Sequence, residues 1–475
     1  MLRNEDIKKI DELKTDFTHR WFEVDFVMKV IDIFKFSSLL KSFSHFKKQG
    51  YNFKEVLSIL LILPFVGITN INLMQDKNFK AKKDVFYRLK NKPSIDWRSI
   101  LWLFVMKFVN IVAANASDTG NIKCLIIDDS FLEKSGRYIE KISRMWDHVS
   151  KRYILGFKLN VMGLWDGVSF IPIDFALHRE KGKNKKKPYG LTKKELKKQF
   201  GKKREKGVES YERAKEADQT KIETGIKMFK RAIKRGLQFD YLLMDSWYTC
   251  NEFIELVRSV KNRTIHLIGM YKIVKTIFTY NDKSVTYSQL RNLLGKPKRN
   301  RKTGYYYLEA VVLLKGKPVK LFFSKKGKNG KWKTILTTNT DLSFIKMLEI
   351  YAIRWSIEVF FKEGKQLLSL GKDQANDFDS QIASATLVMM QYILISTRYR
   401  FDNYESKGEL FRQAKVEIFR ENLSNRLWGL LLEILNMIIE IFENEDADEL
   451  IEKMFNDEKV YRKIENFINF SKIAA

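Results

Sequence analysis

The chain has 475 residues, of which 45% are hydrophobic and 30% charged, as in an ordinary globular protein with two or three domains. Its charge is unusual, because 87 Lys and Arg against 57 Asp and Glu leave a formal net charge of +30. Two cysteines cannot build a zinc site alone, and the five scattered histidines show no ligand spacing. Zinc proteins are therefore excluded, and any bound metal has to be held by oxygen.

The excess of positive charge predicts a polyanionic partner, and nucleic acid is the expectation. Lys and Arg that neutralise phosphates release condensed counterions, which drives binding. A generically basic protein, or one that touches anionic lipid, is the alternative. The longest apolar run, residues 56–68, is interrupted by Pro64 and Gly67 and is shorter than the roughly 20 residues that cross a bilayer. The N-terminus lacks the hydrophobic centre of a secretory signal, so we expect a cytoplasmic, nucleoid-associated protein without a membrane partner.

Residues 1–117 are predicted to be helical, because apolar residues recur at intervals of three and four. Basic clusters accompany them, at Lys47 and Lys48 and again over residues 80–92. Such clusters indicate either the solvated faces of ordinary helices or a helical DNA-binding domain. We take the second as the hypothesis for this N-terminal region.

The pattern changes to strands after Asn121. Residues 122–128 form a short, continuously apolar run that ends in acid, which is typical of a buried strand. Residues 152–165 and 168–177 are longer β-rich runs, joined by Asp166-Gly167, a favoured two-residue hairpin turn. Three antiparallel strands are predicted here.

A strongly basic block runs from His178 to about Lys206 and contains almost no apolar residues. We expect an exposed insertion that is disordered, or ordered only on a phosphate backbone. A helix is predicted over residues 217–235, ended by Gly236. A strand ending in Asp245, a helix over residues 251–261 and a strand over 264–271 follow, and this alternation indicates parallel strands.

Residues 273–339 return to a period of two and contain Asn329-Gly330, a strong hairpin signal, so they are predicted to form a β-rich inserted subdomain. A long helix capped by Asp341 or Ser343 should then run to about Leu368. The expected division is a core of residues 118–272 and 340–370, with a helical C-terminal region, residues 371–475, for dimerisation or DNA contact.

Two predicted strands end in aspartate, at Asp128 and Asp245. The ends of neighbouring parallel strands lie close together, and ligands gather there. Carboxylate oxygens select Mg²⁺ or Mn²⁺ rather than zinc, and Mg²⁺ takes one or two carboxylates together with water and substrate phosphate. Phosphoryl transfer suits such a site, although strand-terminal aspartates also commonly just cap loops.

The helix after the β-rich segment offers a third acid. At roughly 100° per residue, Tyr351, Arg354, Glu358 and Lys365 return to nearly the same side, and Lys362 joins them. An acid among phosphate-binding cations suits a polyanionic substrate held against a metal. The alternative is a set of ordinary salt bridges on a solvated helix.

The spacing of these four residues resembles the YREK signature of bacterial insertion-sequence transposases of the DDE type, family four. The segments IIDDSFLEKSG and LLMDSWYTCNEF resemble the first- and second-aspartate strands of that family. The resemblance covers about residues 120–370, and the helical ends agree only in general character. It implies an α/β fold, in which a ribonuclease-H-like catalytic core is interrupted by a β-rich insertion between helical N- and C-terminal regions.

The resemblance further implies that Asp128, Asp245 and Glu358 hold two Mg²⁺ (or Mn²⁺) ions for in-line cleavage and strand transfer. The residues Tyr351, Arg354, Lys362 and Lys365 would bind the DNA backbone. Asp129 follows Asp128, and only one of the two can enter the site because successive strand residues face opposite ways; the motif favours Asp128. Trp247 could stack on a displaced base, whereas a packed core aromatic is the alternative.

The expected partners are double-stranded DNA, as terminal inverted repeats and as target, and a second copy of the chain on paired ends. One alternative is a metal-dependent nuclease of the same fold, such as a junction resolvase, that cleaves without strand transfer. Another is a transposase-derived DNA-binding protein that no longer cuts, although all three acids are present.

Overall fold

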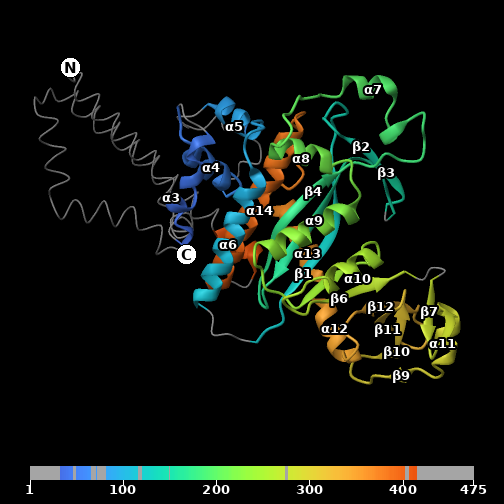
Figure 1. Ribbon diagram of the computed structural model, residues 1–475. Helices are drawn as coiled ribbons and strands as arrows, with labels where there is room; N and C mark the ends of the chain where they lie inside the picture. Colours follow the sequence, from blue (N-terminus) through green and yellow to red (C-terminus); the bar gives the residue numbers. More distant parts are fainter. Residues whose placement is uncertain are drawn as a thin grey trace, which may run out of the picture. The chain divides into compact units, whose positions relative to one another are not determined.

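The computed structural model describes residues 33–46, 50–65, 71, 82–115, 120–148, 150–272, 276–401 and 406–413. The chain divides into two compact units. The core unit is Asp84–Asp402, and the smaller unit combines Met1–Lys83 with Asn403–Ala475 (Figure 1). The core unit carries all of the predicted catalytic residues.

The described part of the core unit is built on one twelve-stranded mixed sheet. Its hydrogen-bonded order is β2-β3-β1-β5-β6-β12-β11-β10-β7-β8, with β4 paired to β3 and β9 to β10. The strands of the first half are β1 (Cys124–Glu133), β2 (Ser143–Asp147), β3 (Arg152–Trp165), β4 (Phe170–His178), β5 (Tyr241–Met244) and β6 (His266–Tyr271). Those of the second half are β7 (Ile277–Tyr280), β8 (Lys283–Thr286), β9 (Lys298–Arg299), β10 (Tyr305–Leu314), β11 (Lys317–Lys326) and β12 (Lys333–Thr337).

Strand directions in the first half follow the prediction. Strand β1 is antiparallel to β3, and β3 is antiparallel to β4. Strand β1 is also parallel to β5, which is parallel to β6. Both the antiparallel run and the parallel unit are confirmed, while the short strand β2, antiparallel to β3, was missed.

The β-rich segment does not form a sheet of its own. Strand β12 pairs antiparallel with β6, with Thr337 opposite Ile268, so the second half continues the sheet of the first half. The Asn329-Gly330 hairpin forms between β11 and β12, but its connection spans residues 327–332. A two-residue turn lies instead at Lys315-Gly316, where both residues have positive φ (48° and 75°), as a type I′ hairpin turn requires.

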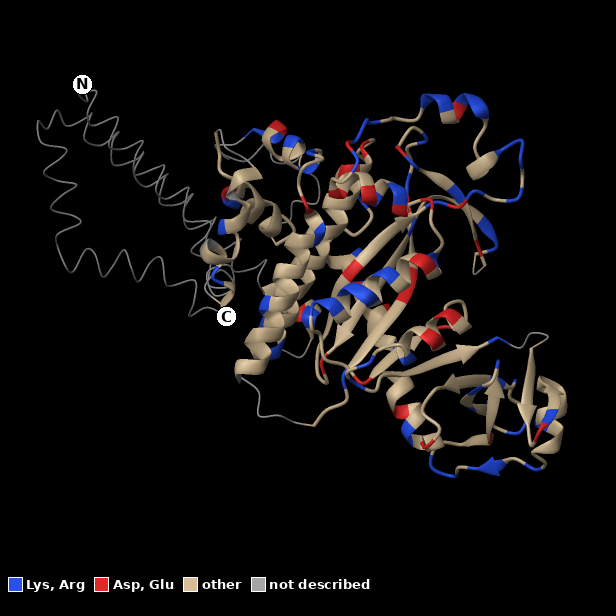
Figure 2. Ribbon diagram, viewed as in Figure 1, with Lys and Arg blue, Asp and Glu red and all other residues tan. Residues whose placement is uncertain are grey.

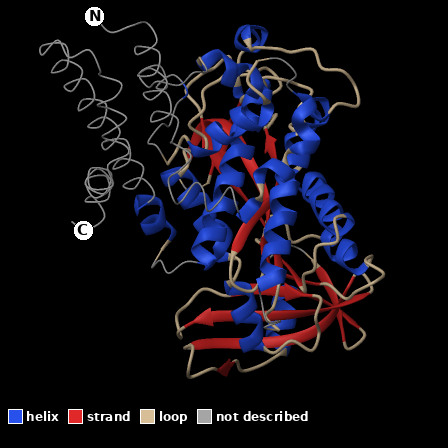
Figure 3. Cartoon of the chain, turned by 90° about the vertical axis from the view of Figure 1, so that its left-hand side faces the viewer, coloured by secondary structure: helices blue, strands red, loops and turns tan. Residues whose placement is uncertain are grey.

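Helices lie against the strands of the core unit (Figure 3). The helices α6 (Trp97–Asn115), α9 (Lys221–Lys234) and α14 (Phe378–Phe401) contact β4, and α10 (Asn251–Arg258) contacts β6. The remaining helical elements of this unit are α5 (Lys83–Lys90, beginning one residue ahead of it), η4 (Pro188–Gly190), α7 (Lys193–Lys198), α8 (Glu209–Glu216), α11 (Tyr287–Leu293), α12 (Phe344–Ala352) and α13 (Trp355–Leu367). The domain boundary predicted after residue 117 lies inside the core unit, which begins at Asp84.

By length and composition, α6 is the one described helix that is long and apolar enough to cross a membrane. The prediction from the longest apolar run, residues 56–68, did not include this helix. Within the core unit it packs on β4 and α14. Its Trp102, Phe104 and Phe108 are fully buried there. This packing is that of a core helix.

The predicted long helix is two helices. Ser343 caps α12 by accepting a hydrogen bond from the backbone N–H of Lys346, and Asp341 is not the cap. Between α12 and α13, Ile353 and Arg354 donate their backbone N–H groups to carbonyls three residues back rather than four. This tightened turn interrupts a regular α-helix directly in the stripe that was predicted from helical periodicity.

The smaller unit contributes α3 (Phe36–Leu39), η2 (Lys41–Phe46) and α4 (Phe53–Ile62) to the described residues. Asn52 begins α4 with a reciprocal capping box to Glu55. Phe65 contacts Phe411, with ring centroids 5.3 Å apart, which joins the two chain segments of this unit. The helix expected over residues 427–442 lies outside the described residues.

The expectation that the basic block is disordered, or ordered only on a phosphate backbone, is wrong, because η4 and α7 form within it. The expectation that it is exposed is wrong at its end, where Arg204 packs among buried acids. The Arg204 guanidinium donates to both oxygens of Glu140 at 2.6 and 2.7 Å and to Asp379 at 3.1 Å. The Lys202 ammonium lies 2.5 Å from Asp377 and 3.0 Å from Asp379. Buried charges are tolerated where they are paired and hydrogen-bonded, and these acids are remote in the sequence.

A second buried charge cluster holds α9 and α6 on β4. Asp174 is fully buried and lies 2.6 Å from Arg231 and 3.3 Å from Arg98. Burial alone would raise the pKa of Asp174, but these guanidinium groups hold it below its usual value. Arg98 also contacts Glu216 at 2.6 Å, so the cations and acids neutralise one another.

We expect Asp174→Ala to lower the free energy of unfolding by about 3–5 kcal/mol, because it removes the fully buried carboxylate that Arg98 and Arg231 share. Urea titration followed by circular dichroism measures this. The matched control is Glu349→Ala, which removes the half-exposed Lys346–Glu349 pair (3.2 Å) and should cost less than about 1 kcal/mol. Equal losses in the two variants would contradict a structural role for the cluster.

Candidate active site

The parallel register of β1 and β5 brings two aspartates together. Ile127 pairs with Met244, and the next residues are Asp128 and Asp245. Burial raises the pKa of Asp128 to about 7, helped by the negative charge of Asp245 and opposed by Arg354. Burial also raises the pKa of Asp245, opposed by a hydrogen bond from the backbone N–H of Trp247. The pair is thus a partly desolvated concentration of negative charge.

One guanidinium connects this pair to the predicted glutamate. Arg354 donates from Nη1 to Asp128 Oδ2 at 2.7 Å and from Nη2 to Glu358 Oε1 at 2.5 Å. Asp128 and Glu358 are separated by 230 positions in the chain, yet they bind opposite ends of the same group. The structure therefore gathers the predicted acids at one edge of the sheet.

These acids do not already surround one point. Within the described ranges, no three Asp, Glu, His or Cys side chains are arranged to hold one metal ion. Arg354 instead supplies the positive charge between Asp128 and Glu358. All the available donors are carboxylate oxygens, the type that Mg²⁺ and Mn²⁺ prefer, so the set fits such an ion in kind.

Two more members of the predicted stripe contact the same strands. The Tyr351 hydroxyl donates to the carbonyl oxygen of Met244 at 3.3 Å, and burial raises its pKa to about 12. The Lys365 ammonium donates to Ser130 Oγ at 2.7 Å, and burial lowers its pKa. Lys362, in contrast, is exposed on α13. Three of the four basic and phenolic residues of the stripe, Tyr351, Arg354 and Lys365, therefore contact β1 or the end of β5.

Asp129 faces the opposite side of the sheet from Asp128. It forms an ion pair with Lys221 at the start of α9, and its Oδ2 lies 3.0 Å from the hydroxyl of the fully buried Tyr248. The same hydroxyl lies 3.0 Å from Oδ1 of Asn160, which is the cross-strand partner of Asp129. Asp128 and Ser130 therefore face α13, while Asp129 belongs to a buried polar cluster under α9.

Trp247 is an exposed aromatic beside Asp245, with 56% of its surface accessible. The Lys272 ammonium lies 2.9 Å from the centre of its ring, and the His148 ring centroid lies 5.7 Å away. The alternative of a packed core aromatic is therefore wrong. An exposed indole beside a lysine ammonium can stack on a flat group such as a nucleobase.

Sequence reasoning missed Ser130, Lys221 and Lys272. Ser130 was open to detection, because it lies two residues after Asp128 on a strand and so shares its face. Lys221 and Lys272 carried no signal, because each is one lysine among many and only tertiary packing brings it to Asp129 or Trp247.

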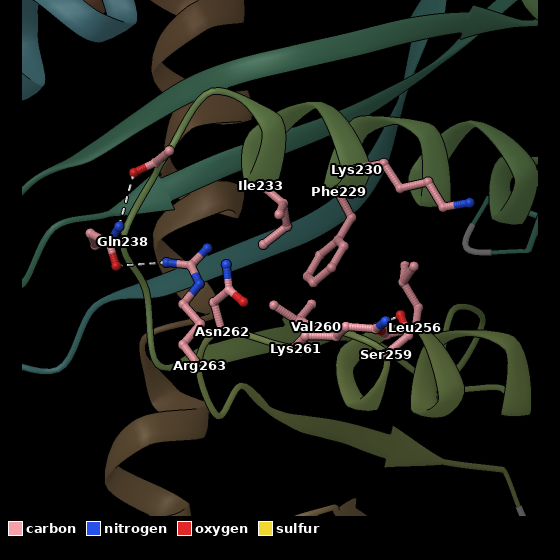
Figure 4. Close-up of a pocket in the computed structure, with 11 residues that line it drawn as sticks. Phe229, Lys230, Ile233, Gln238, Leu256, Ser259, Val260, Lys261, Asn262 and Arg263 are labelled. Atoms are coloured by element: carbon pink, nitrogen blue, oxygen red, sulfur yellow. Dashed lines mark hydrogen bonds between the residues drawn. The ribbon is translucent and has the colours of Figure 1, made fainter.

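A groove of about 580 Å³ lies between the carboxyl-terminal ends of α9 and α10 (Figure 4). Phe229, Ile233 and Leu256 give it apolar walls, while Lys230 and Arg263 add positive charge. It contains none of the predicted site residues. It is therefore separate from the acids, which lie at the other end of both helices.

We expect Tyr248→Phe to lower the free energy of unfolding by about 1–2 kcal/mol, because Asp129 and Asn160 lose a buried hydroxyl. Thermal or urea unfolding measures the change. Tyr153→Phe is the control, because that side chain is 63% exposed and should give no measurable loss. Unaltered stability of Tyr248→Phe would show that the cluster under α9 does not fix Asp129.

Two family models match this chain. The first, described as DDE superfamily endonuclease, matches residues 72–280, which include Asp128 and Asp245. The second, described as Transposase DDE domain, matches residues 178–394, which include Asp245 and Glu358. No curated protein matches the chain. The two matches, together with the mixed α/β sheet and its helices, support a DDE-superfamily transposase or endonuclease.

Proposed function

We propose that the chain is an insertion-sequence transposase that cleaves DNA and joins the cut strand to a target at Asp128, Asp245 and Glu358. The observation that carries the proposal is the Arg354 bridge from Asp128 to Glu358, beside Asp245. It gathers acids that are remote in sequence. The spacing of Tyr351, Arg354, Glu358 and Lys365 supports the family-four type with the YREK signature.

The three carboxylates would hold two divalent ions, Mg²⁺ or Mn²⁺. When bound, such ions activate the attacking oxygen and neutralise charge on the leaving oxygen of an in-line displacement. Arg354 already supplies positive charge to Asp128 and Glu358. In this proposal Arg354 releases at least one carboxylate, and its guanidinium is then free to bind a phosphate with two hydrogen bonds.

The neighbouring side chains would orient the DNA. Lys365, held by Ser130, presents a partly desolvated ammonium on the face that carries Asp128. The Tyr351 hydroxyl donates to the carbonyl at the end of β5, and it can donate to a DNA backbone oxygen when it gives up that hydrogen bond. Lys362 extends this contact from the exposed side of α13. Trp247 would stack on a base displaced from the duplex beside Asp245.

The proposed substrates are double-stranded terminal inverted repeats and target DNA. Two ends have to be held together for coordinated cleavage, so we propose a homodimer on paired ends. Residues 1–117 would contribute DNA binding, and residues 371–475 dimerisation or further DNA contact. The net charge of +30 supports a polyanionic substrate, and a cytoplasmic, nucleoid-associated location would give access to it.

Cleavage without strand transfer is the second candidate, and the match to a superfamily endonuclease favours it specifically. Its active site would be the same. Incubation of a pre-cleaved end with plasmid target separates the two, since a transposase joins them and a simple nuclease does not.

We expect Asp128→Asn, Asp245→Asn and Glu358→Gln each to lower the rate of DNA-end cleavage by about three orders of magnitude, or ~4 kcal/mol, because each removes a metal-binding carboxylate. Binding of the same DNA should persist in a gel-shift assay. Chelation with EDTA should abolish cleavage by the unaltered chain, and Mg²⁺ or Mn²⁺ should restore it.

The control for these variants is Asp282→Asn, an exposed residue with positive φ (60°) in the β7–β8 turn, where Asn is well tolerated. It should cleave normally. Full cleavage by any one of the three site variants, or cleavage that persists in EDTA, would rule out the assignment.

We expect Arg354→Ala and Lys365→Ala each to weaken kcat/KM roughly ten- to hundred-fold, since each removes a charge-assisted contact worth about 1.5–3 kcal/mol. Metal binding, measured by Mn²⁺ titration, should be retained. Lys362→Ala is the control from the exposed side of α13 and should have a smaller effect. Normal kinetics in both Arg354→Ala and Lys365→Ala would show that these residues do not contribute to DNA binding or cleavage.

A further inference from the structure

We propose that residues 181–198, here called the basic arm, bind the phosphate backbone of duplex DNA beyond the active site. The arm contains nine lysines and one acid, Glu195. All nine lysines are exposed, and none makes an ion pair with any residue that the structure describes: Lys181, Lys183, Lys185, Lys186, Lys187, Lys193, Lys194, Lys197 and Lys198. This inference rests on the proposed function, because it extends the surface that holds the same substrate.

The first half of the arm is a loop that a hydrogen bond closes and that contacts hold to the core unit. The backbone N–H of Tyr189 donates to the carbonyl of Lys181 at 2.8 Å. The guanidinium of Arg179 lies 3.9 Å from the centre of the Tyr189 ring and 2.5 Å from Asp218. Leu191, directly after this loop, is fully buried. The loop is therefore attached to the core unit through neutral and paired groups.

The second half of the arm is attached as firmly. Thr192 and Glu195 form a capping box at the start of α7, so the arm's one acid serves the helix end. After α7, the Gln199 side chain donates to the carbonyl of Ile142 at 3.1 Å, and the Phe200 backbone N–H donates to Tyr138 at 2.8 Å. The lysines are thus carried on a defined piece of backbone.

The arm lysines differ from the basic residues that follow them in having no acidic partners within the described part of the chain. Lys202 and Arg204 have counter-charges supplied by Glu140, Asp377 and Asp379. The arm lysines have no such acids, and Figure 2 shows several blue stretches on α7 and its flanking loops, with one acidic turn in α7. Crowded like charges repel one another, and a polyanion relieves that repulsion. Duplex DNA, with one negative charge per ~1.7 Å of axis, is the matching partner.

The position of the arm suits the same duplex that enters the active site. Element η4 packs on β2, which pairs with β3 opposite the carboxyl end of β1. From Asp128 to Glu133, β1 extends about 17 Å. One turn of DNA extends about 34 Å, so a duplex bound at Asp128 is long enough to pass the end of β1.

The arm does not suit a membrane surface. Leu191 of the arm is buried and the arm's exposed surface is polar, so the arm lacks the apolar face that inserts into membranes.

The test compares two triple variants of the full chain. Lys185→Gln, Lys186→Gln and Lys187→Gln neutralise the arm, and Lys302→Gln, Lys328→Gln and Lys331→Gln neutralise equally exposed lysines of the β-rich segment. Binding of a labelled DNA duplex of arbitrary sequence is measured without Mg²⁺ between roughly 50 and 200 mM salt. The slope of log K against log salt counts the phosphate contacts.

We expect the slope to become shallower by about two to three in the arm variant and to stay unchanged in the control. An unaltered slope in the arm variant, or an equal change in both, would overturn the inference. Because no metal is present, the slope reports binding alone. If the arm does not bind DNA, the unaltered chain should still cleave DNA. If the chain does not cleave DNA, the arm variant and its control should still differ in slope.

Discussion

The site depends on the parallel pairing of β1 with β5. These strands are separated by more than a hundred residues, and their register places Asp128 next to Asp245. Strand alternation then decides which side of the sheet each residue faces. Asp128 and Ser130 face α13, while Asp129 joins Tyr248 and Lys221 on the other side. A shift of one residue in this register would exchange Asp128 for Asp129 and remove the first acid from Glu358.

Gathering carboxylates has an electrostatic cost, and the structure offsets it with cations on both faces. Burial and Asp245 together raise the pKa of Asp128 to about 7, against the influence of Arg354. On the other face, Lys221 neutralises Asp129. Removing Arg354 from Asp128 would leave a partly desolvated carboxylate pair, which a divalent ion can neutralise better than one guanidinium. Arg354 therefore holds Asp128 and Glu358 together, and in the proposed function it is also the group that has to move when divalent ions bind.

Much of the fold could be predicted from the sequence because its signals are local. The apolar run before Asp245 is β5, and the alternation around Asp245 indicated parallel pairing. The apolar run before Asp128 is the first part of β1, but the prediction that this strand ends at Asp128 is wrong, because β1 continues to Glu133. The stripe was predicted from the spacing of a single helix. It lies instead across α12, the turn at Arg354 and α13, and Tyr351, Arg354 and Lys365 do contact the strands. Carboxylate chemistry then indicated a hard cation.

What could not be predicted depends on contacts between remote segments. The acids that neutralise Arg204 lie far along the chain, so composition alone suggested a disordered block. The pairing of β12 with β6 made one sheet where the period-two pattern suggested a separate subdomain. The tightened turn at Arg354 leaves the helical pattern intact while changing its hydrogen bonds. The exposure of Trp247 likewise reflects the loop after Asp245 rather than its own sequence context.

The central claim is that these three acids share divalent ions and that Arg354 makes room for them. A crystal structure of the chain with Mn²⁺ and an end-DNA duplex, with data collected at the manganese absorption edge, tests it most directly. The account predicts anomalous density coordinated by Asp128, Asp245 and Glu358, with Arg354 displaced from at least one carboxylate toward a phosphate. Density confined to other sites, with the Arg354 bridge from Asp128 to Glu358 intact beside the bound DNA, would contradict it.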